Sequence, residues 1–183
     1  MKKETFFITG NKGKIEEVQA ITGLNLIAKN LDIPEIQSLD VEKVARAKAM
    51  EAFKLVGRPI IVDDTGMSIE ALNGLPGALV VWFLDKLKPE GIVNLLSQEK
   101  NRKASVSTCI AYADKTGVYT FVGIVRGEIA LAPRGERGFG YDPIFIPEGQ
   151  EKTYAEMSSE KKNEISMRKI ALLKFKEFLS ERV

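Results

Sequence analysis

Two neighbouring segments with the alternation of β-strands constrain the fold of this chain most. Residues 103–112 and 118–126 alternate in polarity and favour β-branched side chains. The turn-forming sequence Asp114-Lys115-Thr116-Gly117 lies between them, as expected where two antiparallel strands are joined. The sequence therefore predicts a β-hairpin, and the sheet that contains it cannot be purely parallel.

Strand and helix patterns alternate in the rest of the chain. Apolar runs that end at glycine, proline or aspartate predict strands, and apolar residues at helical spacing predict helices. The predicted strands cover 5–9, 24–28 and 59–62. The first predicted helix contains Ile15, Val18 and Ile21, the second ends near Gly57, and two more cover 79–87 and 89–96. The last predicted helix carries Ile165, Leu172, Phe175 and Leu179. The fold class is therefore α/β or α+β, with a mixed central sheet flanked by helices. We expect residues 1–183 to form a single domain.

The chain has no histidine, which excludes Ser-His-Asp triads, Cys-His dyads and zinc bound by histidine. Acid, base and metal roles must fall to carboxylates and lysines. Such a set favours a hard cation, Mg²⁺ or in its place Mn²⁺. The one cysteine, Cys109, cannot form an internal disulfide and is expected to be an ordinary strand residue rather than a nucleophile.

The charges of the chain are balanced and dispersed. There are 27 basic and 25 acidic residues, for a net charge of +2. No basic face is expected, so nucleic acid is not a predicted partner. The apolar stretch before Gly10 is too short for a signal peptide or a membrane span. We therefore expect a cytoplasmic protein with no membrane partner.

A short loop after the first predicted strand has the features of an anion site. It consists of Thr9, Gly10, Asn11, Lys12, Gly13 and Lys14. Asn11 can cap the following helix, whose first amides and positive dipole end attract phosphate. Ile15 stands where a Walker loop requires Ser or Thr, so a P-loop mechanism is disfavoured. Taken alone, the loop is equally compatible with a capped surface helix.

Carboxylates are the next candidates for chemistry. Asp63 and Asp64 follow the strand predicted at 59–62, so we expect them at a strand end, which is a frequent place for active sites. If the strand continued, their side chains would point to opposite faces. Glu35, after Pro34, is a further possible oxygen ligand, although a solvated loop charge is the simpler interpretation.

Two later segments have the composition of a nucleobase pocket. Gly138-Phe139-Gly140-Tyr141-Asp142-Pro143 places two aromatic residues beside an acid, as suits stacking on a base, but a tight turn closed by core aromatics is the alternative. Lys161-Lys162-Asn163 and Ser166-Met167-Arg168 lie near the start of the last predicted helix. Arg168 could donate hydrogen bonds to a planar ligand.

Taken together, these blocks resemble the inosine triphosphate pyrophosphatase family. The blocks are residues 9–14, Asp63-Asp64-Thr65-Gly66, Gly74-Leu75-Pro76-Gly77, residues 138–143, and Lys162-Asn163 through Arg168. The resemblance spans nearly the whole chain. It implies a homodimer of two-lobed subunits, with the active-site cleft between the lobes, that hydrolyses ITP, dITP and XTP to the monophosphate and pyrophosphate.

The resemblance also implies a role for each matching position. Asp64 and Lys14 would be catalytic, and Glu35 and Asp64 would bind Mg²⁺. The substrate would be bound by Thr9, Gly10, Asn11, Lys12, Gly13, Lys14, Thr65, Phe139, Gly140, Tyr141, Asp142, Lys162, Met167 and Arg168.

One position departs from the family pattern, and it leaves alternatives open. The family usually has Ser-His-Arg where this chain has Ser166-Met167-Arg168. A thioether cannot donate the hydrogen bond of an imidazole, so base selectivity could differ. A pyrophosphatase for other modified or pyrimidine nucleotides is therefore one alternative, and a nucleotide-sensing module without turnover is another.

Overall fold

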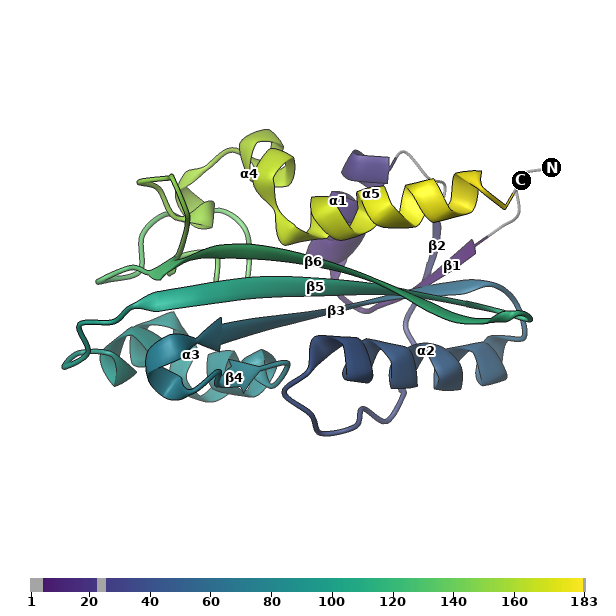
Figure 1. Ribbon diagram of the computed structural model, residues 1–183, viewed down its shortest axis with the longest axis horizontal. Coiled ribbons are helices and arrows are strands. Elements are labelled where there is room, and N and C mark those ends of the chain that lie inside the picture. The colour runs from purple at the N-terminus through teal and green to yellow at the C-terminus, as the bar shows by residue number, and fades with distance from the viewer. Residues whose placement is uncertain (1–4, 23–25, 183) are drawn as a thin grey trace.

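A mixed sheet organises the fold (Figure 1). The computed structural model describes residues 5–22 and 26–182. Its strands are β1 (Thr5–Ile8), β2 (Leu26–Lys29), β3 (Ile60–Ile69), β4 (Pro76–Gly77), β5 (Lys103–Asp114), β6 (Gly117–Ile129) and β7 (Phe145–Pro147). They run in the order β2-β1-β3-β5-β6-β7, and β4 pairs with β3 beside this path. β1 is parallel to β2 and β3, whereas β5 is antiparallel to β3 and β6. The predicted mixed α/β fold is confirmed.

Helices cover both faces of the sheet. α1 (Lys12–Thr22) and α5 (Met167–Ser180) lie on one face, and α2 (Val41–Val56) lies on the other (Figure 1). The remaining helices are α3 (Val80–Leu95), α4 (Ser159–Ile165) and the 3-10 turns Glu70–Leu72 and Tyr154–Glu156. In the ranges given above, no helix is long and apolar enough to cross a membrane.

Local sequence signals account for several boundaries. Asp40 accepts hydrogen bonds from the Glu42 and Lys43 amides at the start of α2, and Gly57 ends that helix in the left-handed conformation. The hairpin turns at Lys115-Thr116, with Asp114 opposite Gly117 as predicted. Lys88 is non-helical and divides α3 into two halves, which matches the two helices predicted around Pro89. Residues 24 and 25 of the strand predicted at 24–28 lie outside the described part of the chain.

The prediction that Asp63 and Asp64 lie at a strand end is wrong. β3 continues through both residues to Ile69, because its antiparallel pairing with β5 continues, with Asp63 opposite Ile110 and Asp64 opposite Cys109. The strand that does end here is β1, whose last pair with β3 is Ile8 with Val62. The two carboxylates therefore lie beside the carboxyl end of β1, in the middle of β3.

The last predicted helix is divided in two. Ser166 has an extended backbone and accepts a hydrogen bond from the Lys169 amide, so it caps a new helix, α5. Ile165, predicted to lie on the stripe of the final helix, is the last residue of α4. Lys162 and Arg168 consequently come from different helices.

The apolar core separates along β3 into clusters on either side of the two aspartates. Ile60 and Val62 pack under α2, and Ile61 packs with α1 and α5. Met67 and Ile69 pack at the other end of the sheet, in a cluster that includes α3. The polar stretch 63–65 lies between these clusters, which leaves room for a site.

The start of α5 rests directly on β6 at Gly123. A β-carbon built on Gly123 would lie 2.0 Å from the carbonyl oxygen of Met167. We therefore expect Gly123→Ala to lower the free energy of unfolding by about 2 kcal/mol or more, because the contact is with backbone that cannot yield without moving the helix. Urea denaturation would measure the change.

Gly91→Ala is the matched control. Its added carbon meets only Leu87, one turn earlier in α3, with the Leu87 β-carbon nearest at 2.9 Å, and alanine is the better helix former. We expect this variant to lose much less stability than Gly123→Ala. Equal stability of the Gly123 and Gly91 variants would show that α5 is not held against β6 at this point.

Candidate active site

A cleft of ≈ 560 Å³ collects most of the predicted site residues. Its lining includes Thr9, Gly10, Asn11, Lys14, Glu35, Asp64, Thr65, Phe139, Gly140, Tyr141, Asp142, Lys162, Met167 and Arg168. Lys12 and Gly13 are not among its lining residues. They line an adjoining cavity of ≈ 450 Å³, which shares Asn11, Phe139 and Lys162 with the cleft.

The loop after β1 is built as the sequence predicts. The Asn11 side chain accepts a hydrogen bond from the Lys14 amide at 3.2 Å, which caps α1. The Thr9 hydroxyl accepts one from the Asn11 amide at 3.1 Å. The side chain of Lys14 turns into the cleft and donates to the carbonyl oxygen of Asp63 at 3.0 Å. This end of the cleft therefore presents a helix N-terminus and an ammonium group to an anion.

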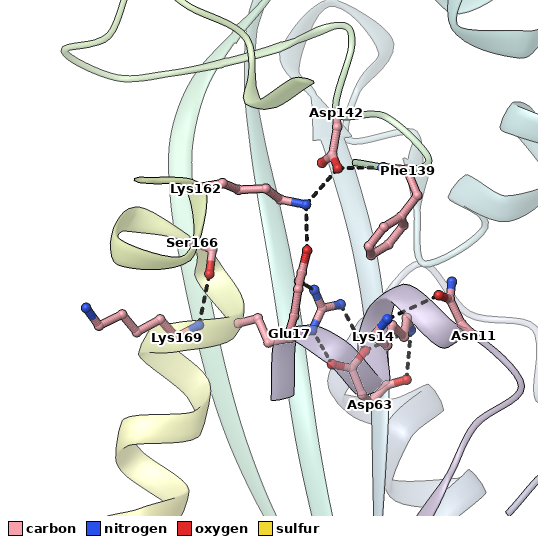
Figure 2. Close-up of polar contacts among 10 residues, drawn as sticks. Asn11, Lys14, Glu17, Asp63, Phe139, Asp142, Lys162, Ser166 and Lys169 are labelled. Carbon is pink, nitrogen blue, oxygen red and sulfur yellow. Dashed lines mark hydrogen bonds and ion pairs between the residues drawn. The ribbon is translucent and has the colours of Figure 1, made fainter. Parts of the chain in front are cut away.

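The opposite end of the cleft holds a network of buried charges (Figure 2). Lys162 of α4 donates to Glu17 of α1 at 2.7 Å and to Asp142 at 2.6 Å. The same Asp142 oxygen accepts the amide hydrogen of Phe139 at 2.7 Å. A β-carbon on Gly138 would lie 2.0 Å from that oxygen, so glycine is required for the loop to close on the carboxylate.

Arg168 connects this network to the centre of the cleft. Its Nε donates to Asp63 at 2.7 Å, and its Nη1 donates to Glu17. The ring of Phe139 lies close to both cations, with its centroid 4.7 Å from Lys162 Nζ and 5.9 Å from Arg168 Cζ. One aromatic face is thus held beside several hydrogen-bond donors and acceptors, an arrangement that suits a planar heterocycle.

The two adjacent aspartates have opposite electrostatic environments. Burial would raise the pKa of Asp63, but Arg168 and Lys14 outweigh it and hold that pKa well below its usual value. Burial raises the pKa of Asp64 to about 6, because Lys14 and Lys48 compensate only in part. Asp63 is therefore a permanent anion, whereas Asp64 can accept and release a proton near neutral pH.

A pair of carboxylates beside Lys48 is the candidate metal site. Lys48 of α2 contacts Glu35, and its ammonium nitrogen lies 4.0 Å from Asp64 Oδ2. Lys48 brings the two carboxylates to one place and neutralises part of their negative charge. Within residues 5–22 and 26–182, no group of three or more His, Cys, Asp or Glu side chains could hold a metal ion. Any cation here would need further oxygen ligands from water or from a ligand.

Cys109 does not take part in the site. It is buried in β5 opposite Asp64, and burial raises its pKa to about 12. A thiol that remains protonated is a poor nucleophile, in agreement with the sequence-based expectation.

Thr65 lines the cleft, and its amide donates to Asp64 Oδ1 at 2.9 Å.

Sequence reasoning missed two charged residues of the site. Glu17 lies three positions after Lys14, so both fall on one side of α1, a spacing that could have indicated it. Lys48 lies four positions after Val44 on the apolar stripe of α2, where a lysine is unusual. The charged partners of Glu17 and Lys48 lie on other elements of the fold, so only the tertiary structure identifies them.

Comparisons with known proteins give the family context. The sequence profile of the Ham1 family matches residues 5–178. The chain is 44% identical to a dITP/XTP pyrophosphatase of Methanopyrus kandleri over 98% of both chains, and 41% identical to an inosine triphosphate pyrophosphatase of Yarrowia lipolytica over 96% of this chain and 95% of that one. Its fold is similar to the Staphylococcus aureus Ham1 protein, with a TM-score of 0.87 and 31% identity over 99% of this chain and 100% of the other.

The raised pKa of Asp64 predicts that this carboxylate destabilises the metal-free fold. Between its usual value of 3.8 and about 6, the folded state binds the proton more tightly than the unfolded state, so stability falls as the pH rises through this window. We expect Asp64→Asn to raise the free energy of unfolding at pH 7.5 by on the order of 2 kcal/mol. Thermal melts in EDTA should show this gain, and the gain should vanish below about pH 4.

Asp114→Asn is the control with the opposite sign. Burial would raise the pKa of Asp114, but hydrogen bonds from Thr116 outweigh it and lower that pKa. Its loss should therefore destabilise the protein at pH 7.5. If Asp64→Asn also lowered the melting temperature there, the proposed electrostatic cost of Asp64 would be wrong.

Proposed function

The chain belongs to the Ham1 family, and from this membership we propose that it hydrolyses ITP, dITP and XTP to the nucleoside monophosphate and pyrophosphate. It is accordingly a nucleoside triphosphate pyrophosphatase, a hydrolase of phosphoric anhydrides, with a role in clearing deaminated purines from the nucleotide pool. The observation that carries the proposal is the single cleft in which a phosphate-binding helix start faces an aromatic ring surrounded by donors.

The triphosphate would lie at the β1–α1 end of the cleft. Thr9, Asn11 and Lys14 supply a capped helix start and a cation there. Gly10, Lys12 and Gly13 belong to the same loop, although Lys12 and Gly13 border the adjoining cavity. Thr65, beside Asp64, would contact the substrate between its two ends.

We propose Mg²⁺ as the cofactor, with Mn²⁺ as a possible substitute. Glu35 and Asp64 would hold it, because their contacts with the one ammonium group of Lys48 place the two carboxylates near each other. Two carboxylates and no nitrogen or sulfur ligand suit a hard cation that completes its shell with water and phosphate oxygens. When bound, the cation would neutralise phosphate charge and make a bound water more acidic.

Hydrolysis then needs an oriented water and a proton acceptor. As the water oxygen bonds to phosphorus, the anhydride P–O bond breaks, the Asp64 carboxylate takes the proton, and pyrophosphate leaves. Asp64 would be ionised near neutral pH with the cation bound, because nearby positive charge lowers a carboxyl pKa, so it can act as the base. Lys14 would compensate the charge that develops on the phosphates. No covalent intermediate is required.

The base would stack on Phe139 at the other end of the cleft. Gly140, Tyr141, Asp142, Lys162, Met167 and Arg168 surround this position. A guanidinium N–H of Arg168 facing the six-position oxygen of hypoxanthine or xanthine would oppose the amino group of adenine, leaving donors unpaired. Met167 is 2% exposed and offers no hydrogen-bond donor here, which keeps other modified or pyrimidine nucleotides as the alternative substrates.

Further features remain predictions. We propose that residues 1–183 form one domain, because the strands of the path β2-β1-β3-β5-β6-β7 form one continuous sheet. A cytoplasmic location without nucleic-acid or membrane partners is predicted from the sequence. A homodimer is also proposed, and the neighbouring apolar side chains Val81 and Trp82, which are 67% and 62% exposed, support an interface at the start of α3.

A nucleotide panel tests the proposed activity. We expect pyrophosphate release with Mg²⁺ from ITP, dITP and XTP, and a much lower kcat/KM for ATP and GTP. Asp64→Asn should lower kcat for ITP at least 100-fold, which is the usual contribution of a general base. Preference for a pyrimidine or another modified nucleotide would favour the alternative enzyme, and tight ITP binding without turnover would favour the sensing module.

Light scattering coupled to size-exclusion chromatography tests the dimer. We expect twice the chain mass of 20.3 kDa, and we expect Trp82→Glu to shift the protein to the monomer by burying a charge in the interface. Leu55→Glu is the control, because Leu55 is equally exposed at the end of α2. A monomeric wild type would refute the dimer without affecting the proposed activity.

A further inference from the structure

Asp63 lies between the two ends of the cleft and contacts a cation from each. Its Oδ1 is 2.8 Å from the Lys14 ammonium nitrogen, at the phosphate end. Its Oδ2 accepts from Arg168 Nε at 2.7 Å, at the base end, and Oδ1 lies 3.3 Å from Arg168 Nη2. The carboxylate is fully buried, and the Arg168 side chain is 1% exposed.

The contacts with Asp63 determine how each cation is presented. The carboxylate engages Nε and Nη2 along one edge of the planar guanidinium, a fork geometry that fixes its plane. Nη1 is thereby directed to Glu17, beside the ring of Phe139. Lys14 is held twice by the same residue, through the carboxylate and the main-chain carbonyl oxygen. Rotation of the Asp63 side chain would therefore move both cations.

We propose that Asp63 is a positioning residue that couples base discrimination to the placement of the phosphate-end lysine. The inference rests on the proposed function, in which Lys14 faces phosphate and Arg168 faces the base. Asp63 need not touch the substrate or the metal ion. Its neighbour Asp64 points toward Lys48 and Glu35, so the two adjacent carboxylates have separate tasks.

The chemistry of the carboxylate predicts how substitutions behave. Asparagine has the same shape, but only its amide oxygen can accept hydrogen bonds. With that oxygen at the Oδ1 position it can still meet Lys14 and Arg168 Nη2, but its NH₂ group then opposes the Nε–H donor of Arg168. Glutamate is longer but keeps two acceptor oxygens and the charge. If packing alone mattered, asparagine would be the milder change. If positioning of two cations matters, glutamate is the milder change.

The experiment compares Asp63→Asn and Asp63→Glu in the full-length protein with Mg²⁺. We measure kcat and KM for ITP and for ATP, and divide kcat/KM for ITP by kcat/KM for ATP. This ratio does not depend on the folded fraction of the enzyme. For Asp63→Asn we expect this ratio to fall about tenfold, the effect of one hydrogen bond of ~1.4 kcal/mol. We also expect kcat for ITP to fall without a rise in KM, since loss of a negative charge does not weaken attraction for an anion. Asp63→Glu should keep the ratio within about threefold of wild type.

Asp114→Asn serves as the matched control, because it removes a carboxylate that pairs with Arg182 far from the cleft. It should leave the ratio unchanged. An unchanged ratio in folded Asp63→Asn, or a larger loss in Asp63→Glu than in Asp63→Asn, would overturn the inference. Should Asp63→Asn fail to fold, a tenfold loss of the ratio in folded Asp63→Glu would overturn it, and a retained ratio would support it.

A separate binding measurement distinguishes this inference from the proposed activity. Trp82 is the only tryptophan and lines the cleft, so its fluorescence can follow titration with IMP and AMP. If the wild type releases no pyrophosphate from ITP, the proposed activity fails. The ratio of the Kd for AMP to the Kd for IMP then tests the role of Asp63 without any turnover. Equal preference in wild type and Asp63→Asn would then reject the inference.

Discussion

The arrangement of the cleft depends on one buried network of charges, which runs from Lys14 through Asp63, Arg168, Glu17 and Lys162 to Asp142. Buried charges are costly unless each is paired and hydrogen-bonded. Their partners come from α1, β3, the loop before β7, α4 and α5. The network therefore requires these elements to meet at one place, and removing one member would leave its charged partners with one ion pair fewer.

The same network explains how neighbouring aspartates acquire different properties. Successive side chains of β3 point to opposite faces of the sheet. Asp63 meets Arg168 and Lys14 on the face covered by α1 and α5, whereas Asp64 meets Lys48 of α2 on the other. Strong pairing keeps Asp63 ionised, and incomplete pairing leaves Asp64 with a pKa of about 6. An anion that positions cations and a carboxylate that exchanges a proton are thus obtained from one dipeptide.

Much of the fold was predictable because local chemistry decides it. The hairpin follows from alternation and a turn at Lys115-Thr116, and the limits of α2 follow from Asp40 and Gly57. The full length of β3 was not predictable, because residues 63–66 are polar or glycine and remain in the strand only through pairing with β5. The division of α4 from α5 depends on the backbone of Ser166, whose capping role several other serines could equally have had.

By itself the sequence determined the chemical inventory: no histidine, a capped loop from Thr9 to Lys14, carboxylates at 35, 63 and 64, and an aromatic turn at 138–143. Its blocks also indicated the family, which the relatives confirm. Only the tertiary structure decided which charges are paired. Arg168 reaches Asp63 across 105 positions of sequence, and such contacts depend on sheet order and helix packing, which no local spacing encodes. For that reason Glu17 and Lys48 emerged as members of the site only after folding brought their partners to them.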